Sequence, residues 1–172
     1  MRRTLFDNIR RAPLTEPAPA ADDAELRGLA AQLDKAARAK LGRSLAIREV
    51  DAGSCNGCEL EIQALNNPYY NLEGSGIKFV ASPRHADLLL VTGPVSVNME
   101  EALKRTLDAV PDPKLVIAVG DCGACGGVFG KSYASRGAVS NVIPVHHTVI
   151  GCPPTPLAIM QGILQVVRSA LV

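Results

Sequence analysis

The sequence predicts an α/β domain built on a mostly parallel sheet. Five short aliphatic runs recur between residues 45 and 150, and segments with helical signals separate most of them. Runs that are apolar at nearly every position are typical of strands covered on both faces, as in a parallel sheet. The pattern does not give the strand order, and a doubly wound sheet of the flavodoxin type is the simplest arrangement that satisfies it.

The expected elements alternate along the chain from residue 44 onward. Strands are expected at 45–50, 77–81, 87–92, 115–119 and 145–150. A short helix over 59–65 is expected to stop near Pro68, and Asn98 is expected to cap a helix that ends at about Ala109. The last helix is expected over 156–167.

Residues 1–43 are expected to form an N-terminal extension with a helix, preceding the α/β domain that occupies 44–172. The first 11 residues place Leu5, Phe6 and Ile9 among four arginines, which fits either an amphipathic anchor for a membrane or partner, or a simple tail. A Pro/Ala linker follows over 12–21. A helix is then expected over 22–41, capped by Asp22 or Asp23 and carrying a leucine stripe.

The composition fits one globular domain without a global charge bias. The chain has 172 residues, 47% of them apolar, and a formal net charge of +1, so nothing points to a nucleic-acid partner. Paired arginines near the start are followed by prolines and acids rather than by an apolar run, and a signal sequence is not expected. These features favour a cytoplasmic location.

Four of the five cysteines follow expected strands in glycine-rich loops. Cys55 and Cys58 come after the first strand, Cys122 after the fourth and Cys152, within Cys-Pro-Pro, after the fifth. Because the carboxyl ends of parallel strands meet at one edge of a sheet, these thiols are expected to converge there. Converging thiolates are the ligands of iron–sulfur clusters and of zinc.

An iron–sulfur cluster and a zinc ion both remain compatible with this spacing. Zinc in small ribbons replaces a core, whereas this chain has enough apolar residues to build its own, which favours the cluster. A four-iron cluster needs four ligands, and five cysteines are available. Cys125 is therefore either a spare apolar residue, the interpretation we favour, or a substitute for Cys122.

Two glutamates follow Cys58 on the expected short helix. Glu59 and Glu61 would lie close to a cofactor bound at the cysteines. A carboxylate in that position can take up a proton as the cofactor changes charge, whereas many acids in a first helical turn only interact with the helix dipole. Both interpretations stay open on the residues alone.

The motifs resemble those of a known superfamily. Gly53-Ser-Cys-Asn-Gly-Cys-Glu-Leu-Glu61, the Gly120-Asp-Cys loop that ends at Gly127, and Gly151-Cys-Pro-Pro154 resemble three ligand loops in order. They are those of the small-subunit superfamily shared by NiFe hydrogenases and the B-type subunit of complex I, and the likeness runs from about Ser44 to Arg168. The first motif is most similar to the form in membrane-bound, energy-converting (group 4) hydrogenases, including formate hydrogenlyase.

The resemblance implies a ligand set and a function for the domain at 44–172, which would be cluster-binding. By it, Cys55, Cys58, Cys122 and Cys152 hold one proximal 4Fe-4S cluster, Cys125 need not be a ligand, and Glu61 matches an acidic, catalytic position on a proton path. The protein would be the electron-transfer small subunit of a hydrogenase-like complex at the cytoplasmic face of the inner membrane. Its partners would be a NiFe-type large subunit, a ferredoxin-like subunit and membrane subunits.

Two alternatives accompany this interpretation. One is a complex I-type NADH-quinone oxidoreductase subunit, of the B type, that passes electrons to quinone. Relatives of that type usually carry Arg after Cys-Pro-Pro, where this chain has Thr155, and two adjacent cysteines in the first loop. The other alternative is a zinc-stabilised scaffold without enzymatic activity. The partner's substrate, the electron donor and the role of residues 1–43 are not given by the sequence.

Overall fold

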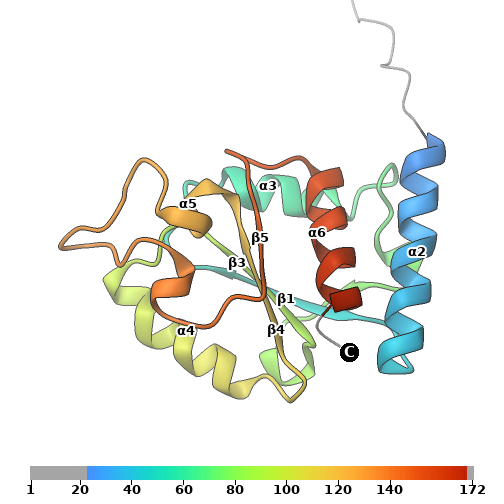
Figure 1. Cartoon of the computed structure of the whole chain (residues 1–172), viewed down its shortest axis with the longest axis horizontal. Helices are drawn as coiled ribbons and strands as arrows, with labels where there is room; N and C mark the ends of the chain where they lie inside the picture. Colours follow the sequence, from blue (N-terminus) through green and yellow to red (C-terminus); the bar gives the residue numbers. More distant parts are fainter. Residues whose placement is uncertain (1–22, 170–172) are drawn as a thin grey trace, which may run out of the picture.

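The computed structural model, which describes residues 23–169, contains one five-stranded sheet (Figure 1). All pairings between its strands are parallel, and the strand order is β2-β1-β3-β4-β5. This is the order of a flavodoxin-type doubly wound sheet, so the expected fold class is confirmed. The strands are β1 (Ala46–Asp51), β2 (Lys78–Phe79), β3 (Leu88–Thr92), β4 (Leu115–Val119) and β5 (His147–Val149).

The two edge strands are shorter than the sequence predicted. Of the five residues expected as a strand over 77–81, only the two of β2 are regularly paired. Of the six expected over 145–150, only the three of β5 are. Each edge strand has one neighbour, so a ladder ends as soon as that neighbour diverges. The central strands β3 and β4 are buried at every position, as their aliphatic runs predicted.

The helices agree with expectation except at three places. They are α2 (Asp23–Leu41), α3 (Gly57–Ala64), α4 (Val97–Ala109), α5 (Gly120–Cys125) and α6 (Pro156–Ser169). The cap of α4 is Ser96 rather than the expected Asn98, because the Ser96 hydroxyl accepts a hydrogen bond from the Met99 amide at 3.3 Å. The helix α5 was expected as a loop, and α3 begins two residues earlier than expected. Asp22 and the segments 1–11 and 12–21 lie outside the described residues.

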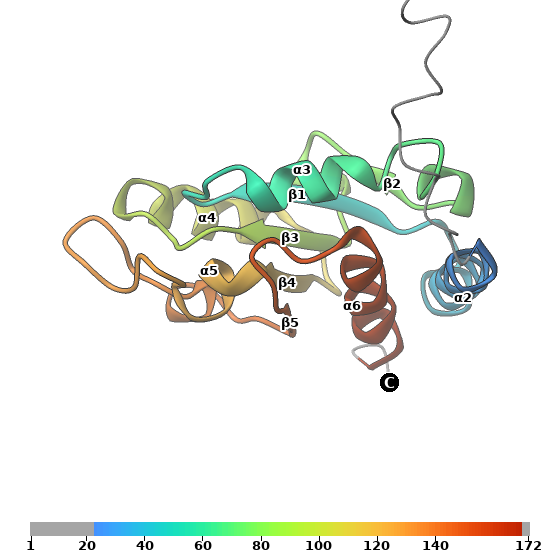
Figure 2. The same ribbon diagram turned by 90° about the horizontal axis from the view of Figure 1, so that it is seen from above.

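Alternate residues of the central strands supply two cores, one on each face of the sheet. Leu88 and Leu90 of β3 join a large cluster with α2, α3 and α6, whereas Leu89 and Val91 join a smaller cluster with Leu103 of α4. Figures 1 and 2 show α4 on one face and α3 with α6 on the other. Both faces of the sheet are thereby covered, as a parallel sheet requires.

The helix α2 packs on α6 at one end of the molecule (Figure 2). Its predicted stripe is buried, with Leu26, Leu29, Leu33 and Ala37 in the larger core. The side chain of Arg168 on α6 also donates a hydrogen bond to that of Gln32 at 2.8 Å. The helix therefore contributes to the domain core. Among residues 23–169 no helix is long and apolar enough to cross a membrane.

The amino ends of the strands are tied by the buried carboxylate of Asp87. It accepts hydrogen bonds from the Ala46 amide at 2.9 Å and from the guanidinium of Arg43, at 3.0 Å for one of the two contacts. A buried carboxylate is stable when its oxygens are paired in this way. The expected strand 87–92 therefore starts one residue later, with Asp87 joining β1 to β3.

Candidate cluster site

The four predicted ligand cysteines lie in loops at the carboxyl edge of the sheet. Cys55 and Cys58 follow β1, Cys122 follows β4 within α5, and Cys152 follows β5. In the strand order, β3 separates β1 from β4 and β5. The loops therefore reach one edge from both sides of the central strand, which is where ligands bind in open α/β sheets.

The Cys58 thiol is buried and surrounded by other negative or potentially negative groups. Burial is the main cause that raises the pKa of Cys58 from 9.0 to about 12, and the charge of Glu59 adds to it. Smaller contributions come from the thiols of Cys55, Cys122 and Cys152. This mutual influence indicates that the four sulfurs lie near one another. In the metal-free protein Cys58 is therefore a protonated thiol at neutral pH.

Cys122 is half-buried and has a similar environment. Burial raises its pKa, and the neighbouring thiols of Cys152 and Cys55 raise it further. An iron-bound cysteine must lose its proton, because the thiolate is the ligand. If Cys58 and Cys122 bind iron, their raised pKa values mean that binding would be coupled to proton release at both residues.

Two glycines make room for the sulfurs. A Cβ atom at Gly120 would lie 2.6 Å from the Sγ of Cys58, and one at Gly127 would lie 2.7 Å from the Sγ of Cys122. Both glycines also have positive φ angles, of 85° and 53° respectively, which residues with side chains rarely adopt. The loops are therefore shaped to bring backbone close to sulfur, as a cradle for a bulky group requires.

The first cysteine loop is ordered by its own hydrogen bonds. The Asp51 carboxylate accepts from the amides of Gly53 and Ser54, both at 2.8 Å, and the Ser54 hydroxyl accepts from the amide of Asn56 at 3.0 Å. Asn56, in the left-handed conformation, precedes α3 and makes no side-chain cap. Cys58 consequently lies in the first turn of α3, where backbone amides and the helix dipole favour negative charge.

Asp121 joins the loop of Cys122 to the loop of Cys152. Its amide donates to the Gly151 carbonyl at 2.9 Å, and its carboxylate accepts from the Gly151 amide at 2.8 Å. The two residues each precede a predicted ligand, Cys122 and Cys152. This reciprocal pair fixes the spacing of these two cysteines, and sequence reasoning missed it because the residues are thirty positions apart.

Cys125 lies on the same short helix as Cys122 and is exposed. Its Sγ donates a hydrogen bond to the Asp121 carbonyl at 3.3 Å. Cys125 raises the pKa of Cys122 less than the thiols of Cys152 and Cys55 do. The local contact is that of a helical cysteine bonded to its own backbone four residues earlier.

The two glutamates of α3 differ in their surroundings. Glu59 is 6% exposed, and its two carboxylate oxygens have no hydrogen-bond partner within residues 23–169. Glu61 is half-buried. Burial and the charge of Glu59 raise the pKa of Glu49 on β1, which indicates that these two carboxyl groups lie close together. The buried carboxylate without a hydrogen-bond partner in the described range is thus Glu59, whereas Glu61, the position that the family resemblance singled out, is half-buried.

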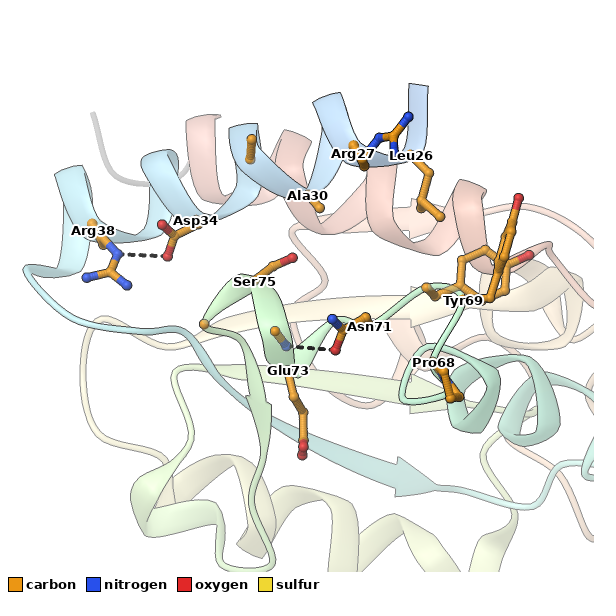
Figure 3. A pocket seen from close by; sticks show the side chains of 14 residues that line it. Leu26, Arg27, Ala30, Asp34, Arg38, Pro68, Tyr69, Asn71, Glu73 and Ser75 are labelled. Carbon is orange, nitrogen blue, oxygen red and sulfur yellow. Dashed lines mark hydrogen bonds and ion pairs between the residues drawn. The ribbon is translucent and has the colours of Figure 1, made fainter. Parts of the chain in front are cut away.

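A large groove of the described residues lies away from the cysteines. A groove of about 540 Å³ lies between α2 and residues 68–76, which precede β2 at the amino ends of the strands (Figure 3). Two polar contacts lie within its lining: Arg38 pairs with Asp34 at 2.8 Å, and the Gly74 amide donates to the side chain of Asn71 at 3.1 Å (Figure 3). None of the predicted ligand cysteines lines it.

The donor set is compatible with an iron–sulfur cluster. Thiolates are the ligands of such clusters, and a four-iron cluster takes four cysteines around its periphery. The four thiols at the glycine-rich carboxyl edge would supply that number. Within residues 23–169, no three His, Cys, Asp or Glu side chains lie close enough together to surround a single ion.

The fold and these thiols define the class, an α/β subunit with a cysteine-rich carboxyl edge. The family described as NADH ubiquinone oxidoreductase, 20 Kd subunit, matches residues 55–166, from the first cysteine to the last helix. The chain belongs to this family, whose members are subunits of oxidoreductase complexes such as hydrogenases and NADH-quinone oxidoreductases. The family resemblance of the sequence motifs is thereby confirmed.

Several relatives share much of the chain. A probable membrane-bound hydrogenase subunit of Pyrococcus furiosus is 48% identical over 72% of this chain and 74% of its own length. Formate hydrogenlyase subunit 7 of Escherichia coli is 42% identical over 85% of this chain but only 56% of its own length. A B-type subunit of the NADH-quinone oxidoreductase of Herpetosiphon aurantiacus is 44% identical over 63% of this chain and 60% of its own length.

A solved structure has the same fold. It is a chain of the membrane-bound sulfane sulfur reductase, an archaeal respiratory membrane complex, and is 36% identical with a TM-score of 0.65. The similarity covers 80% of this chain and 74% of that one. Relatives of this chain therefore occur in complexes whose names refer to different chemistry, namely hydrogenase, formate hydrogenlyase, quinone reductase and sulfane sulfur reductase.

The Cys58 thiol should be the slowest of the five to react in the metal-free protein. Because its pKa of about 12 leaves almost no thiolate at pH 8 and the side chain is buried, we expect iodoacetamide to modify it at least about tenfold more slowly than the exposed Cys55. Its rate should rise as the pH increases from about 9 toward 12. Mass spectrometry of peptides from timed reactions measures both rates. In urea the two cysteines should react at equal rates. Equal rates in the folded chain would contradict the buried environment of Cys58.

The Asp121 side chain should stabilise the fold through its bond to Gly151. Asp121→Ala removes the acceptor of a charge-assisted hydrogen bond, so the free energy of unfolding should fall by about 1–2 kcal/mol. Asp121→Asn keeps an Oδ1 acceptor and should lose less than half of that. Urea denaturation followed by circular dichroism gives both values. If the Asn and Ala variants are equally destabilised, the hydrogen bond is not the source of the effect.

Proposed function

We propose that this chain is the electron-transfer small subunit of a membrane-associated, energy-converting hydrogenase-like complex. In this proposal Cys55, Cys58, Cys122 and Cys152 hold one 4Fe-4S cluster. The observation that carries it is the meeting of four thiols from three loops at the carboxyl edge of the sheet, where they influence one another's protonation. The identity to hydrogenase and formate hydrogenlyase subunits supports the choice of complex.

A bound cluster supplies one-electron transfer between a donor and an acceptor. The chain's own residues set the conditions for it. Cys58 and Cys122 release their thiol protons when they become ligands, and Gly120 and Gly127 leave space beside their sulfurs. Asp121 holds the Cys122 and Cys152 loops in register. Amides at the start of α3 favour the negative charge of the first pair of thiolates.

The partners in this proposal follow from the role. Electrons would pass between a ferredoxin-like subunit and the active site of a NiFe-type large subunit, with membrane subunits anchoring the assembly. The names of the Pyrococcus and sulfane sulfur reductase relatives, both membrane-bound, support a peripheral position on a membrane, which we place at the cytoplasmic face of the inner membrane. An amphipathic segment 1–11 facing the membrane would agree with this position.

A quinone-reducing complex is the second candidate. The family description and the identity to B-type subunits of NADH-quinone oxidoreductases favour it. The spaced Cys55 and Cys58 and the presence of Thr155 favour the hydrogenase type. The large subunit that purifies with this chain distinguishes them, because a NiFe subunit carries four nickel-ligating cysteines and a quinone-reducing one does not.

Single Cys→Ser variants test the ligand set. Cys55→Ser, Cys58→Ser, Cys122→Ser and Cys152→Ser should each lose most of the bound iron and acid-labile sulfide, because a cluster with three thiolates is poorly retained. Cys125→Ser is the matched control and should keep both. Iron, sulfide and zinc contents and the EPR spectrum of the reduced, anaerobically purified protein are measured. Zinc without iron in the wild type, or cluster loss in Cys125→Ser with retention in Cys122→Ser, would refute the assignment.

A role for Glu61 in proton transfer is a further part of the proposal. Glu61 follows Cys58 by three residues on α3, so the two side chains share one side of the helix. Glu61→Gln keeps the shape but cannot carry a proton, and we expect a loss of hydrogen turnover of roughly tenfold or more. The cluster's EPR signal should be unchanged. Glu59→Gln, on the neighbouring buried carboxylate, is the matched comparison. Wild-type turnover in Glu61→Gln would leave Glu61 with only a helix-dipole role.

A further inference from the structure

The loop that follows the central strand contains no cysteine but lies in the middle of the cysteine edge. β3 pairs with β1 on one side and with β4 on the other, so the β3–α4 loop, residues 93–96, leaves the sheet between the loops of Cys55 and Cys122. Gly93 and Pro94 are buried, although connecting loops usually lie at the surface. This loop is therefore packed against its neighbours.

Gly93 brings its backbone against that of the first cysteine loop. A Cβ atom at position 93 would lie 2.5 Å from the amide nitrogen and 2.6 Å from the Cα of Ser54, the residue before Cys55. The φ angle of Gly93, 74°, also lies in the left-handed region that favours glycine. Because the atoms in the way belong to backbone, any other residue at position 93 would have to displace Ser54 and, with it, Cys55.

Two backbone hydrogen bonds hold the same two loops together. The Ala52 amide donates to the Thr92 carbonyl at 3.1 Å, and the Ser96 amide donates to the Ala52 carbonyl at 2.8 Å. Gly53 adds to the contact, since a Cβ atom there would lie 3.1 Å from the carbonyl oxygen of Pro94. The first cysteine loop is therefore fixed to the β3–α4 loop by residues before and after the glycine contact.

The β3–α4 loop is also bonded to the segment that follows Cys122. Residues 126–137 continue from the end of α5 and return to the start of α4, and Figure 1 shows them in orange. The Val95 amide donates to the Gly137 carbonyl at 2.9 Å, and the Val95 carbonyl accepts from the Arg136 amide at 2.7 Å. One loop without a cysteine thus connects the chain before the first ligand pair with the chain after the third ligand.

We propose that the β3–α4 loop is a positioning element for the cluster and that Gly93 is its positioning residue. Through its contact with Ser54, Gly93 sets where Cys55 lies relative to Cys122. This inference rests on the proposed function. Groups that hold metal ligands in place affect how firmly the centre is retained and what electronic properties it has.

Gly42 provides a matched control for the backbone strain of a substitution. It follows α2, away from the cysteines, and its φ angle of 66° is close to that of Gly93. No atom lies within 4 Å of a Cβ atom built at Gly42. Gly42→Ala therefore introduces a side chain at a positive φ angle as Gly93→Ala does, but without the contact to a neighbouring loop.

Iron retention and the EPR spectrum test the positioning role in the anaerobically purified full chain. Gly93→Ala should speed the loss of iron to a chelator by about tenfold or more, the scale that is typical of residues supporting metal ligands. The g values of the reduced cluster should also shift. Gly42→Ala should change neither property. Wild-type iron loss and g values in Gly93→Ala would overturn the proposal.

A second pair of variants covers the case in which Gly93→Ala does not fold. Ser96 has a φ of −70° and a ψ of 152°, which proline can adopt, so Ser96→Pro removes the amide that donates to Ala52. Ser96→Ala removes the hydroxyl that caps α4 but keeps this amide. Iron loss should be at least about threefold faster in the proline variant than in the alanine variant, the effect of one lost hydrogen bond. Equal rates in the two variants would contradict the positioning role of the loop.

Hydrogen exchange in the metal-free chain reports the contact itself and separates this proposal from the proposed function. The Ser54 amide donates to the Asp51 carboxylate at 2.8 Å, and its exchange should become about tenfold faster or more in Gly93→Ala. Neither Gly42→Ala nor Tyr133→Ala, at a 98% exposed residue of the segment 126–137, should change it. Unchanged exchange in Gly93→Ala would overturn the positioning role. Absence of a cluster in the wild type would overturn the proposed function, whereas the exchange rates would still show whether Gly93 holds the Cys55 loop.

Discussion

The whole site depends on the parallel direction of three strands around β3. The central strands β3 and β4 are buried on both faces by side chains that alternate between two cores, so neither their direction nor their register can change without exposing apolar surface. Because β1 pairs in parallel with β3 and β5 pairs in parallel with β4, the carboxyl ends of β1, β4 and β5 share one edge of the sheet. Four cysteines separated by as many as 97 positions in the sequence thereby become neighbours.

Bringing thiols together at such an edge has an electrostatic cost that shapes the chemistry. Burial and neighbouring negative groups oppose the thiolate forms of Cys58 and Cys122 and raise the pKa of both thiols. Iron bound at these cysteines, as proposed, would reverse the balance because its positive charge stabilises thiolates. Cofactor binding would then be linked to proton release and to the positions of the loops, two of which Asp121 connects.

The two edges of the sheet differ in how far their groups are paired. At the amino ends of the strands, the carboxylate of Asp87 is hydrogen-bonded, and α2 packs on α6. At the carboxyl ends, thiols, an orphaned carboxylate at Glu59 and uncovered apolar residues remain within the described range. Such unsatisfied groups are unfavourable in an isolated domain, and they are what a subunit of a larger redox complex would present to its cofactor and partners.

The sequence by itself determined the fold class, the central strands and the motif of the four cysteines. These features depend on local patterns: unbroken aliphatic runs, capping signals, and glycines beside cysteines. Only the tertiary structure decided the lengths of β2 and β5, the Ser96 cap, the helix α5 and the burial of Glu59 in preference to Glu61. It also decided the clasp between Asp121 and Gly151 and the exposure of Tyr133. Most of these properties depend on contacts between residues far apart in the chain, and neither a periodic pattern nor a short motif encodes which distant group a side chain will meet.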